Sequence, residues 1–295
     1  MNDDHDALPT RRTVLMWGAL GALAAPALAS AGAESPASGG AAPSAGGATA
    51  SAGAKAAPPA AVGAPLAAAT LERYMKMHAS TTGGESPWYY TGRIYSVRER
   101  EAPQLLFNFE GTEIYWVRRV AAGEWQLRGS TLTFFRDAAT GAYLDSWVNP
   151  VTGRTIDVKP NVLRTQAGDF SHITAAANQL SSRASLPWQV EVNSVGGICW
   201  LTTSRWLAAA PQPWIEVQTM LAPESELADR RVTSATSTFS STYLAPWLRW
   251  MEMGDAPGHL VWHAAGRKVK SRNDLPTPYR ERAERTSPVH FTEPG

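Results

Sequence analysis

The sequence predicts a mainly β protein: an antiparallel β-barrel of the calycin or lipocalin type, or a β-sandwich, with a few short peripheral helices. Two observations predict this class. After residue 79, apolar and polar residues alternate with a period of two in segments rich in aromatic and β-branched residues. Turn signals such as Ala122-Gly123 and Arg128-Gly129 separate these segments roughly every 8–12 residues, a spacing that is typical of barrels and sandwiches.

We expect one helix before the strands and three later in the chain. Residues 70–78 have apolar side chains at helical spacing, and further helices are expected at residues 171–180, 246–253 and 279–285. The expected strands are residues 88–97, 104–110, 113–117, 125–127, 131–135, 188–193, 198–204, 214–221 and 232–239.

Residues 1–33 are predicted to be a twin-arginine signal peptide rather than part of the fold. Arg11 and Arg12 precede an uncharged run, residues 17–33, that is rich in Ala, Gly and Leu. This run is too weakly apolar for a membrane-spanning helix, which needs about 20 strongly apolar residues, and Ala-x-Ala sites such as residues 27–29 predict cleavage. We therefore expect export by the Tat translocase to the periplasm or the medium, with no stable membrane span after cleavage.

Residues 34–69 are mostly Ala, Gly, Ser and Pro, and we expect a disordered linker because they cannot bury enough apolar surface to offset their ordering entropy. Residues 70–295 then form a single β-rich domain. This domain carries 24 Lys and Arg against 22 Asp and Glu, which gives no electrostatic reason to expect binding to nucleic acid or to an anionic membrane. Cys199, the only cysteine, can form no internal disulfide and is expected to be a small buried residue.

Residues 137–158 contain a repeated turn, D-A-A-T-G and N-P-V-T-G, each followed by a short strand. Gly141 and Gly153 can take a positive φ at the ends of these turns. Asn149 can accept a hydrogen bond from the backbone two residues further on. We favour two hairpin turns that frame a strand, while a role for this segment in ligand contact stays open.

His259 and His263 lie four residues apart, a spacing that has two interpretations. On a helix the pair would be about 5–6 Å apart on one face and could share a metal ion; on a strand it would be about 13 Å apart. Gly258 and Gly266 bound a short segment whose β-branched and aromatic residues favour a strand. We therefore predict a strand with both histidines on one face and Trp262 on the other, and no metal site.

The candidate site residues follow from their chemistry alone, since the sequence contains no G-x-S-x-G, P-loop, G-x-G-x-x-G or C-x-x-C motif. The cofactor is unknown: export of an already folded chain favours one loaded in the cytoplasm, but the sequence names none. Candidates for acid–base chemistry are titratable side chains beside aromatic ones, namely His259, His263, Lys268 and Asp145. Candidates for ligand binding are mostly aromatic, namely Trp88, Tyr90, Trp147, Asn149 and Trp262.

Four blocks of the sequence resemble the DUF1838 family of uncharacterised bacterial and fungal proteins. They are W-Y-Y-T-G-R-I-Y-S-V at residues 88–97, F-R-D-A-A-T-G-A-Y-L-D-S-W-V-N-P-V-T-G at 135–153, P-W-L-R-W-M-E-M-G at 246–254 and G-H-L-V-W-H-A-A-G-R-K at 258–268. The resemblance extends over about residues 70–290 and implies neither a reaction nor catalytic residues.

Two functions fit these observations. The first is a periplasmic or secreted protein that binds a small apolar or aromatic ligand in a Trp/Tyr-rich β-barrel pocket. The second is a periplasmic enzyme of the isomerase, lyase or hydrolase type that does acid–base chemistry on such a molecule in the same pocket. The absence of catalytic motifs places ligand binding slightly ahead of catalysis.

Overall fold

The computed structural model describes residues 66–166, 170–175, 177–180, 185–187, 189–207 and 214–295, so the predicted signal peptide and most of the predicted linker lie outside the described residues. The strands are β1 (Gly84–Val97), β2 (Gln104–Ala121), β3 (Glu124–Asp137), β4 (Ser146–Val148), β5 (Thr155–Asp157), β6 (Asn161–Arg164), β7 (Ser171–Ile173), β8 (Ala177–Leu180), β9 (Ser185–Pro187), β10 (Gln189–Val195), β11 (Ile198–Leu207), β12 (Trp214–Pro223), β13 (Thr238–Ala245) and β14 (His259–Lys268). The helices are α1 (Ala68–His78), α2 (Glu224–Ala228) and α3 (Thr277–Thr286), with 3-10 turns η1 (Arg249–Met251), η2 (Arg272–Asp274) and η3 (Pro288–Phe291).

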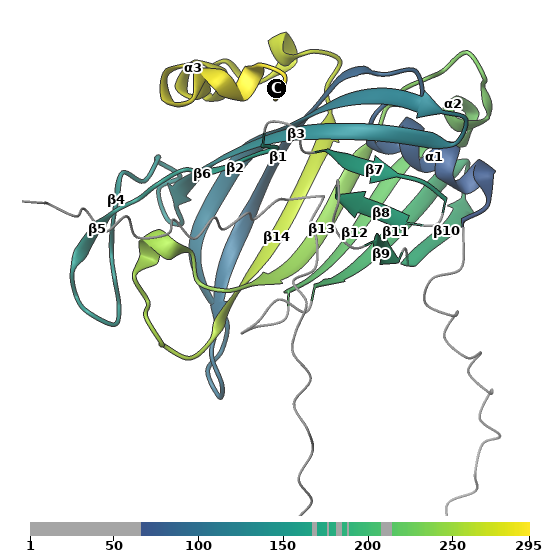
Figure 1. Cartoon of the computed structure of the whole chain (residues 1–295). Helices are drawn as coiled ribbons and strands as arrows, with labels where there is room; N and C mark the ends of the chain where they lie inside the picture. Colours follow the sequence, from purple (N-terminus) through teal and green to yellow (C-terminus); the bar gives the residue numbers. More distant parts are fainter. Residues whose placement is uncertain (1–65, 167–169, 176, 181–184, 188, 208–213) are drawn as a thin grey trace, which may run out of the picture.

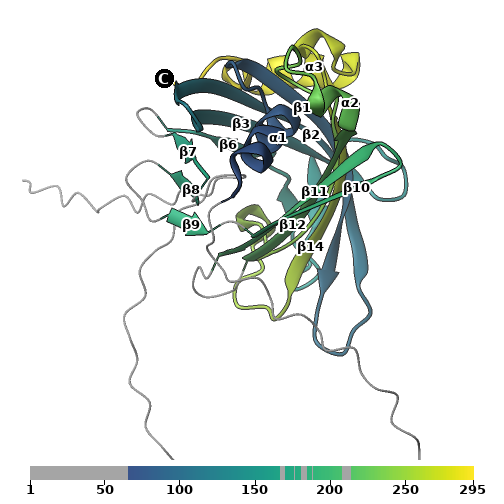
Figure 2. The same cartoon turned by 90° about the vertical axis from the view of Figure 1, so that its right-hand side faces the viewer.

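Twelve strands form one sheet in the order β10-β11-β12-β13-β14-β1-β2-β3-β7-β8-β9, with β6 also paired to β3, while β4 and β5 form a separate hairpin. Every pairing is antiparallel, which confirms the predicted fold class. The sheet is not closed into a barrel, because no pairing among the described residues joins β9 to β10. It curves instead, with β7–β9 on one side, β10–β12 on the other and α1 between them (Figure 2).

The concave side of the sheet, here called the inner face, has a hydrophobic cluster at each end. At one end α1 contributes Leu71, Tyr74 and Met75, which pack against residues of β1, β3, β11 and β12. The other end is aromatic, and its buried rings are Tyr90, Phe107, Phe109, Phe135, Tyr243 and Trp262. Aromatic rings of this size dominate the burial of apolar surface, so these two clusters hold the curved sheet together.

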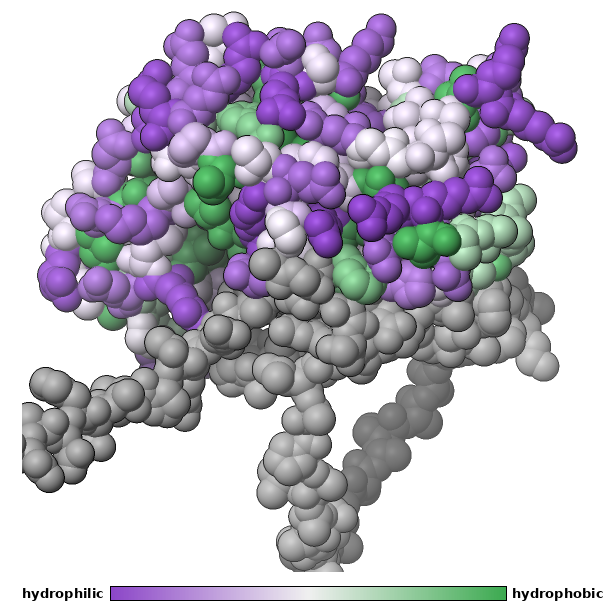
Figure 3. Space-filling model, turned by 45° about the horizontal axis from the view of Figure 1, so that its top comes forward, coloured by the Kyte–Doolittle hydropathy of each residue, from purple (hydrophilic) through white to green (hydrophobic). Residues whose placement is uncertain are grey.

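The convex side, here called the outer face, is covered over β1–β3 by α3 (Figure 1). Tyr279 and Ala283 of α3 are fully buried against Ile114 and Leu132. The Tyr279 hydroxyl donates a hydrogen bond of 2.7 Å to the Leu132 carbonyl. The surface around α3 that faces the solvent is mostly hydrophilic, with scattered hydrophobic residues (Figure 3). The helix thus has a buried apolar side against the sheet and a polar side toward the solvent.

Glycines inside the strands explain why two predicted breaks are absent. The predicted strands 104–110 and 113–117 are one strand, β2, that runs through Gly111. A Cβ at Gly111 would lie 2.5 Å from the Tyr90 hydroxyl, and one at Gly266 would lie 2.5 Å from the Phe239 ring. The glycines therefore give room for aromatic rings on the inner face rather than ending a strand. Likewise β3 joins the predicted strands 125–127 and 131–135 through Gly129.

Three other predictions were wrong in their local structure. Where a helix was expected at residues 171–180, residues 171–173 and 177–180 form β7 and β8, because β7 extends the sheet by pairing with β3. Residues 246–253 contain only the short η1 turn. The strand expected at 232–239 lies further along the chain, at β13. In each case pairing or packing with distant residues outweighs a weak local preference.

Replacing Gly111 should destabilise the fold much more than replacing Gly129 on the neighbouring strand β3. We expect Gly111→Ala to lower the free energy of unfolding by about 1–3 kcal/mol, because its methyl group would overlap the Tyr90 ring. Gly129→Ala is the control, since its Cβ would make an ordinary 3.6 Å contact with Tyr115. Urea unfolding of both variants measures the difference, and equal stabilities would contradict the role given to Gly111.

His290 should make the protein sensitive to acid. Its ring is fully buried, with Nδ1 2.8 Å from Ser130 Oγ and Nε2 2.5 Å from Thr112 Oγ1. Burial, with the nearby Arg164 and Arg272 charges, lowers the pKa of His290 from 6.5 to about 3. The imidazole of His290 therefore takes up a proton more readily in the unfolded chain than in the folded one. The contribution of His290 to the free energy of unfolding is complete above pH 6.5 and is lost by up to about 1.4 kcal/mol per pH unit as the pH drops toward 3.

His290→Gln removes this titration while keeping a polar side chain. We expect its free energy of unfolding to fall less steeply than that of the wild type between pH 6.5 and pH 4. Because all carboxylates are common to both proteins, the difference between the two slopes isolates His290. Parallel slopes in denaturant titrations would show that His290 is not the responsible group.

Candidate functional site

The predicted strand around the histidine pair is confirmed as β14, and so is the predicted split of its side chains. His259 and His263 share one face of β14, while Trp262 points to the opposite side and is 1% exposed. The histidine face is the outer one. There His263 is exposed, and its Nδ1 lies 2.9 Å from Thr242 Oγ1. The two histidines therefore point away from the concave side of the sheet.

The other two acid–base candidates lie elsewhere. Lys268 is on the inner face at the α1 end, where its Nζ is 5.8 Å from the centre of the Trp88 ring. Asp145 is exposed beside α3, with Oδ1 2.8 Å from Arg282 Nη2. The structure thus brings Lys268 together with Trp88 but does not bring the four acid–base candidates into one site. Their catalytic roles stay predictions.

Trp88, Tyr90 and Trp262 all point to the inner face, and side chains that line one pocket must share a face in this way. They are 3%, 3% and 1% exposed. The Trp88 indole N–H donates to the His78 carbonyl, and the Tyr90 hydroxyl lies 2.8 Å from Thr133 Oγ1. These side chains form part of the packed walls of the concave side.

Asn149 closes the aromatic end of the inner face. Its amide is fully buried and makes four hydrogen bonds: Nδ2 donates to the carbonyls of Met251 (2.7 Å) and Glu252 (3.2 Å), and Oδ1 accepts from the backbone N–H groups of Val151 (2.7 Å) and Thr152 (3.0 Å). No hydrogen-bonding capacity of this amide is left over for a ligand. Asn149 therefore ties the β4–β5 hairpin to the η1 segment.

Trp147 also helps to close the aromatic end of the inner face. Its ring centre is 5.9 Å from that of Trp250 and 5.7 Å from that of Phe107. Edge-to-face contacts of this kind favour a fixed arrangement of the rings. The two hairpin turns predicted at residues 137–158 are also present, with Gly141 and Gly153 at φ values of 71° and 68°.

Between the two hydrophobic clusters, polar residues cross the inner face in what we call the inner polar band: Thr131, Thr133, Thr203, Glu216, Gln218, Ser241 and Tyr243. Thr203 and Gln218 are register partners on β11 and β12. Among the described residues, Thr203 Oγ1 and Gln218 Oε1 have no hydrogen-bond partner, although Thr203 is only 1% exposed. Native proteins rarely leave such groups unpaired, so the inner polar band is the candidate functional site.

The two phenols at this band hold their protons. Burial raises the pKa of the Tyr90 hydroxyl, and the charge of Glu113 adds to the rise. Burial also raises the pKa of Tyr243, with further contributions from the neighbouring Tyr90, Glu216 and Glu113. At neutral pH the two tyrosines are therefore hydrogen-bond donors.

Sequence reasoning missed the inner polar band, although a signal for it exists. In β11 the inner positions change from apolar Leu201 to polar Thr203, and in β12 they change from Met220 to Gln218 and Glu216. A polar residue at a position that alternation assigns to the core marks either a paired network or a binding site. Only the pairing of the strands shows that these positions are neighbours.

A second polar cluster lies on the outer face, around the buried carboxylate of Glu110. This carboxylate accepts hydrogen bonds from the Tyr89 hydroxyl (2.7 Å), Arg136 Nη2 (2.5 Å) and the Tyr143 hydroxyl. The Tyr143 ring lies between the guanidinium groups of Arg136 (4.0 Å) and Arg282 (4.2 Å). Burial and the Glu110 hydrogen bond raise the pKa of Tyr143 to about 12. This saturated network fixes the first hairpin turn against β2, β3 and α3.

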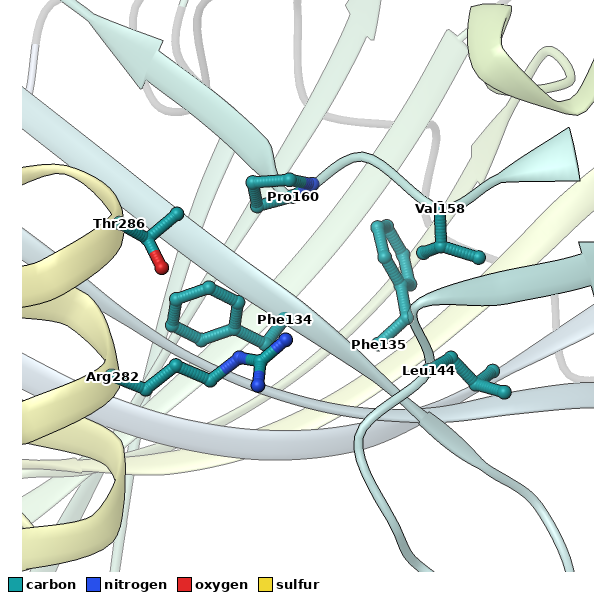
Figure 4. Close-up of a pocket in the computed structure, with 7 residues that line it drawn as sticks. All are labelled: Phe134, Phe135, Leu144, Val158, Pro160, Arg282 and Thr286. Carbon is teal, nitrogen blue, oxygen red and sulfur yellow. The ribbon is translucent and has the colours of Figure 1, made fainter.

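A small cavity lies next to this network at the edge of β3, between Phe134 and Phe135 (Figure 4). Its volume is about 40 Å³, and it is lined by Phe134, Phe135, Leu144, Val158, Pro160, Arg282 and Thr286. Small-molecule sites usually have volumes of about 300–1,000 Å³. The cavity is therefore too small for an organic ligand.

The described residues contain no group of three or more His, Cys, Asp or Glu side chains that could hold a metal ion. Within the same residues, no helix combines the length and apolar character needed to cross a membrane. Cys199 is free and buried, as predicted.

Asn149 should be important for stability rather than for contact with a ligand. We expect Asn149→Ala to lower the free energy of unfolding by about 2–4 kcal/mol, because it removes four hydrogen bonds and leaves the buried Met251 carbonyl without this partner. Asn193→Ala, at an exposed position of β10, is the control and should change stability by less than about 0.5 kcal/mol. Thermal unfolding of both variants checks this, and equal melting temperatures would contradict the role assigned to Asn149.

Comparison with known proteins places the chain in a family. The model of the DUF1838 family, described as a protein of unknown function, matches residues 83–295. No curated protein and no solved structure matches the chain. The matched range includes β1–β14, the inner polar band and all four sequence blocks that predicted the resemblance. Because the match extends over most of its length, this protein belongs to the DUF1838 family.

Proposed function

We propose that the protein is exported through the twin-arginine route and, in the periplasm or the medium, binds a small apolar or aromatic molecule on the inner face of its sheet. The Arg11-Arg12 leader supports export. The aromatic cluster at one end of the inner face supports an apolar or aromatic ligand. Mostly apolar walls with a few polar groups are the usual composition of small-molecule sites.

The observation that carries this proposal is the pair of unpartnered groups in the inner polar band. Thr203 Oγ1 and Gln218 Oε1 lie on neighbouring strands, and neither has a hydrogen-bond partner among the described residues. A buried polar atom without a partner costs about 1–3 kcal/mol. A ligand that supplies a polar group to both atoms would recover that free energy while its apolar part lies against the aromatic end.

The same band supports a second candidate, an enzyme that does acid–base chemistry on such a molecule. Tyr90 and Tyr243 keep their protons, and the negative charges of Glu113 and Glu216 contribute to the raised pKa of Tyr243. Proton donors and carboxylate bases near each other are what acid–base catalysis needs. Mass spectrometry of the ligand before and after incubation with the full chain separates the two candidates, because a binding protein releases its ligand unchanged.

Thr203→Val tests the site because valine has the same shape as threonine but lacks the hydroxyl. We expect the ligand-free variant to be as stable as the wild type or more stable by about 1 kcal/mol, since an unpaired polar atom is removed. We also expect it to bind N-phenyl-1-naphthylamine, a neutral aromatic amine, at least about fivefold more weakly, a difference of about 1 kcal/mol. Fluorescence titration of the probe with the full chain measures the affinity.

Thr202→Val is the matched control, because Thr202 is the next residue on β11 and faces outward, where Oγ1 lies 2.9 Å from Thr219 Oγ1. It should bind the probe as the wild type does. Equal affinities of wild type and both variants would overturn the assignment of Thr203. Failure of the wild-type chain to bind any apolar or aromatic probe would overturn the proposed function itself.

A further inference from the structure

A separate cleft of about 480 Å³ lies away from the aromatic end, where the chain leaves α1 and enters β1. Its volume falls within the range of about 300–1,000 Å³ that is usual for small-molecule sites. It is lined by the segment after α1, the start of β1, the segment before β13 and the end of β14: Ser80, Thr82, Gly83, Glu85, Ser86, Thr233, Ser234, Ala235, Thr236, Lys268, Val269 and Lys270.

The walls of this cleft, here called the lysine cleft, are tied to each other. The Thr81 backbone N–H donates to the Thr233 carbonyl at 2.8 Å. The Ser234 hydroxyl donates to the Ala79 carbonyl, also at 2.8 Å. These bonds join segments that are about 150 residues apart in the sequence, so the cleft has a defined shape.

The lining of the lysine cleft is polar and positively charged. Six of its residues carry hydroxyl groups, and two are lysines. The one lining carboxylate, Glu85, is neutralised by Arg272, whose Nη2 lies 2.6 Å from Oε2. Hydroxyl groups can donate hydrogen bonds to an anion, and ammonium groups attract it.

Lys268 occupies an unusual position in this cleft. Its Nζ donates to the carbonyls of Lys76 (2.7 Å) and Ala79 (3.0 Å) and to Ser234 Oγ (3.0 Å), a set of acceptors that suits the ammonium form. Burial nevertheless lowers the pKa of Lys268 to about 7, against a small opposing effect of Glu226. An anion in the cleft would stabilise the ammonium form, so anion binding and protonation of Lys268 should favour each other.

We propose that the lysine cleft binds a small oxyanion, a carboxylate or a sulfate- or phosphate-like group, through the charges of Lys268 and Lys270 and the surrounding hydroxyl groups. The site is distinct from the inner polar band and does not depend on the function proposed above. Lys270 is exposed and contributes its charge at the mouth of the cleft. Lys268 contributes from the floor, where it also holds the end of α1.

The test measures the binding of sulfate, and separately of succinate, to the full chain by calorimetry, with chloride at equal ionic strength as the reference. We expect Lys270→Ala to weaken binding about three- to tenfold, because it removes one charge from the site. Lys159→Ala is the control, since Lys159 is exposed beside β5 and pairs with Asp157. Binding of sulfate only, succinate only or both supports the proposal and identifies the preferred oxyanion. The absence of binding beyond chloride, or equal losses in the two variants, would overturn it.

The pH dependence of sulfate binding tests whether Lys268 contributes to the site. It needs no substitution of Lys268, which would disturb the end of α1. Sulfate keeps its charge between pH 6 and pH 9. The other charged groups that face the cleft or Lys268 are Glu85, Glu226, Lys270 and Arg272. Sulfate affinity should therefore fall as the pH rises through 7 and Lys268 loses its proton. An affinity that is constant from pH 6 to pH 9 would overturn the assignment of Lys268 to the site.

Discussion

The register of β1 between β14 and β2 is the constraint on which the rest of the structure depends. Once Tyr90 is opposite Gly266 and Gly111, the alternation of a β-strand assigns the side chains of the three strands to alternate faces, as far as the register shift between β1 and β2 at Ile94 and Tyr95. Trp88, Trp262 and Lys268 then point inward, and His259 and His263 point outward. The small size of the two glycines stabilises this register, because the Tyr90 ring lies against Gly111 and the Phe239 ring lies against Gly266.

This register divides the inner face into parts with different chemistry. Both ends are packed hydrophobic clusters, in which the loss of a contact costs stability. The inner polar band between them contains buried groups that the described residues leave unpaired, which costs stability and is characteristic of sites that bind something. The lysine cleft beyond the α1 end is polar, so the protein offers two environments with different ligand preferences.

The sequence blocks that identify the family are mostly structural in this protein. The block at 135–153 crosses the edge of β3: Tyr143 joins the Glu110 network on the outer face, while Trp147 and Asn149 close the aromatic end on the inner face. The block at 246–254 supplies the carbonyl groups that Asn149 binds. A dense motif of turn residues and aromatic residues thus marks a closure that holds the sheet edge. The two unpartnered groups of the inner polar band, Thr203 and Gln218, lie in β11 and β12, outside all four blocks.

The sequence by itself determined the antiparallel β class, the strand at the histidine pair, the hairpin turns at Gly141 and Gly153 and the final helix, because alternation and turn chemistry act between near neighbours. The tertiary structure decided which face of each strand is buried, why Gly111 does not end a strand and why β7 pairs with β3 where a helix was expected. It also decided that Thr203 lies beside Gln218. These outcomes depend on contacts between residues far apart in the chain, and the local sequence pattern is the same whichever way the strand faces.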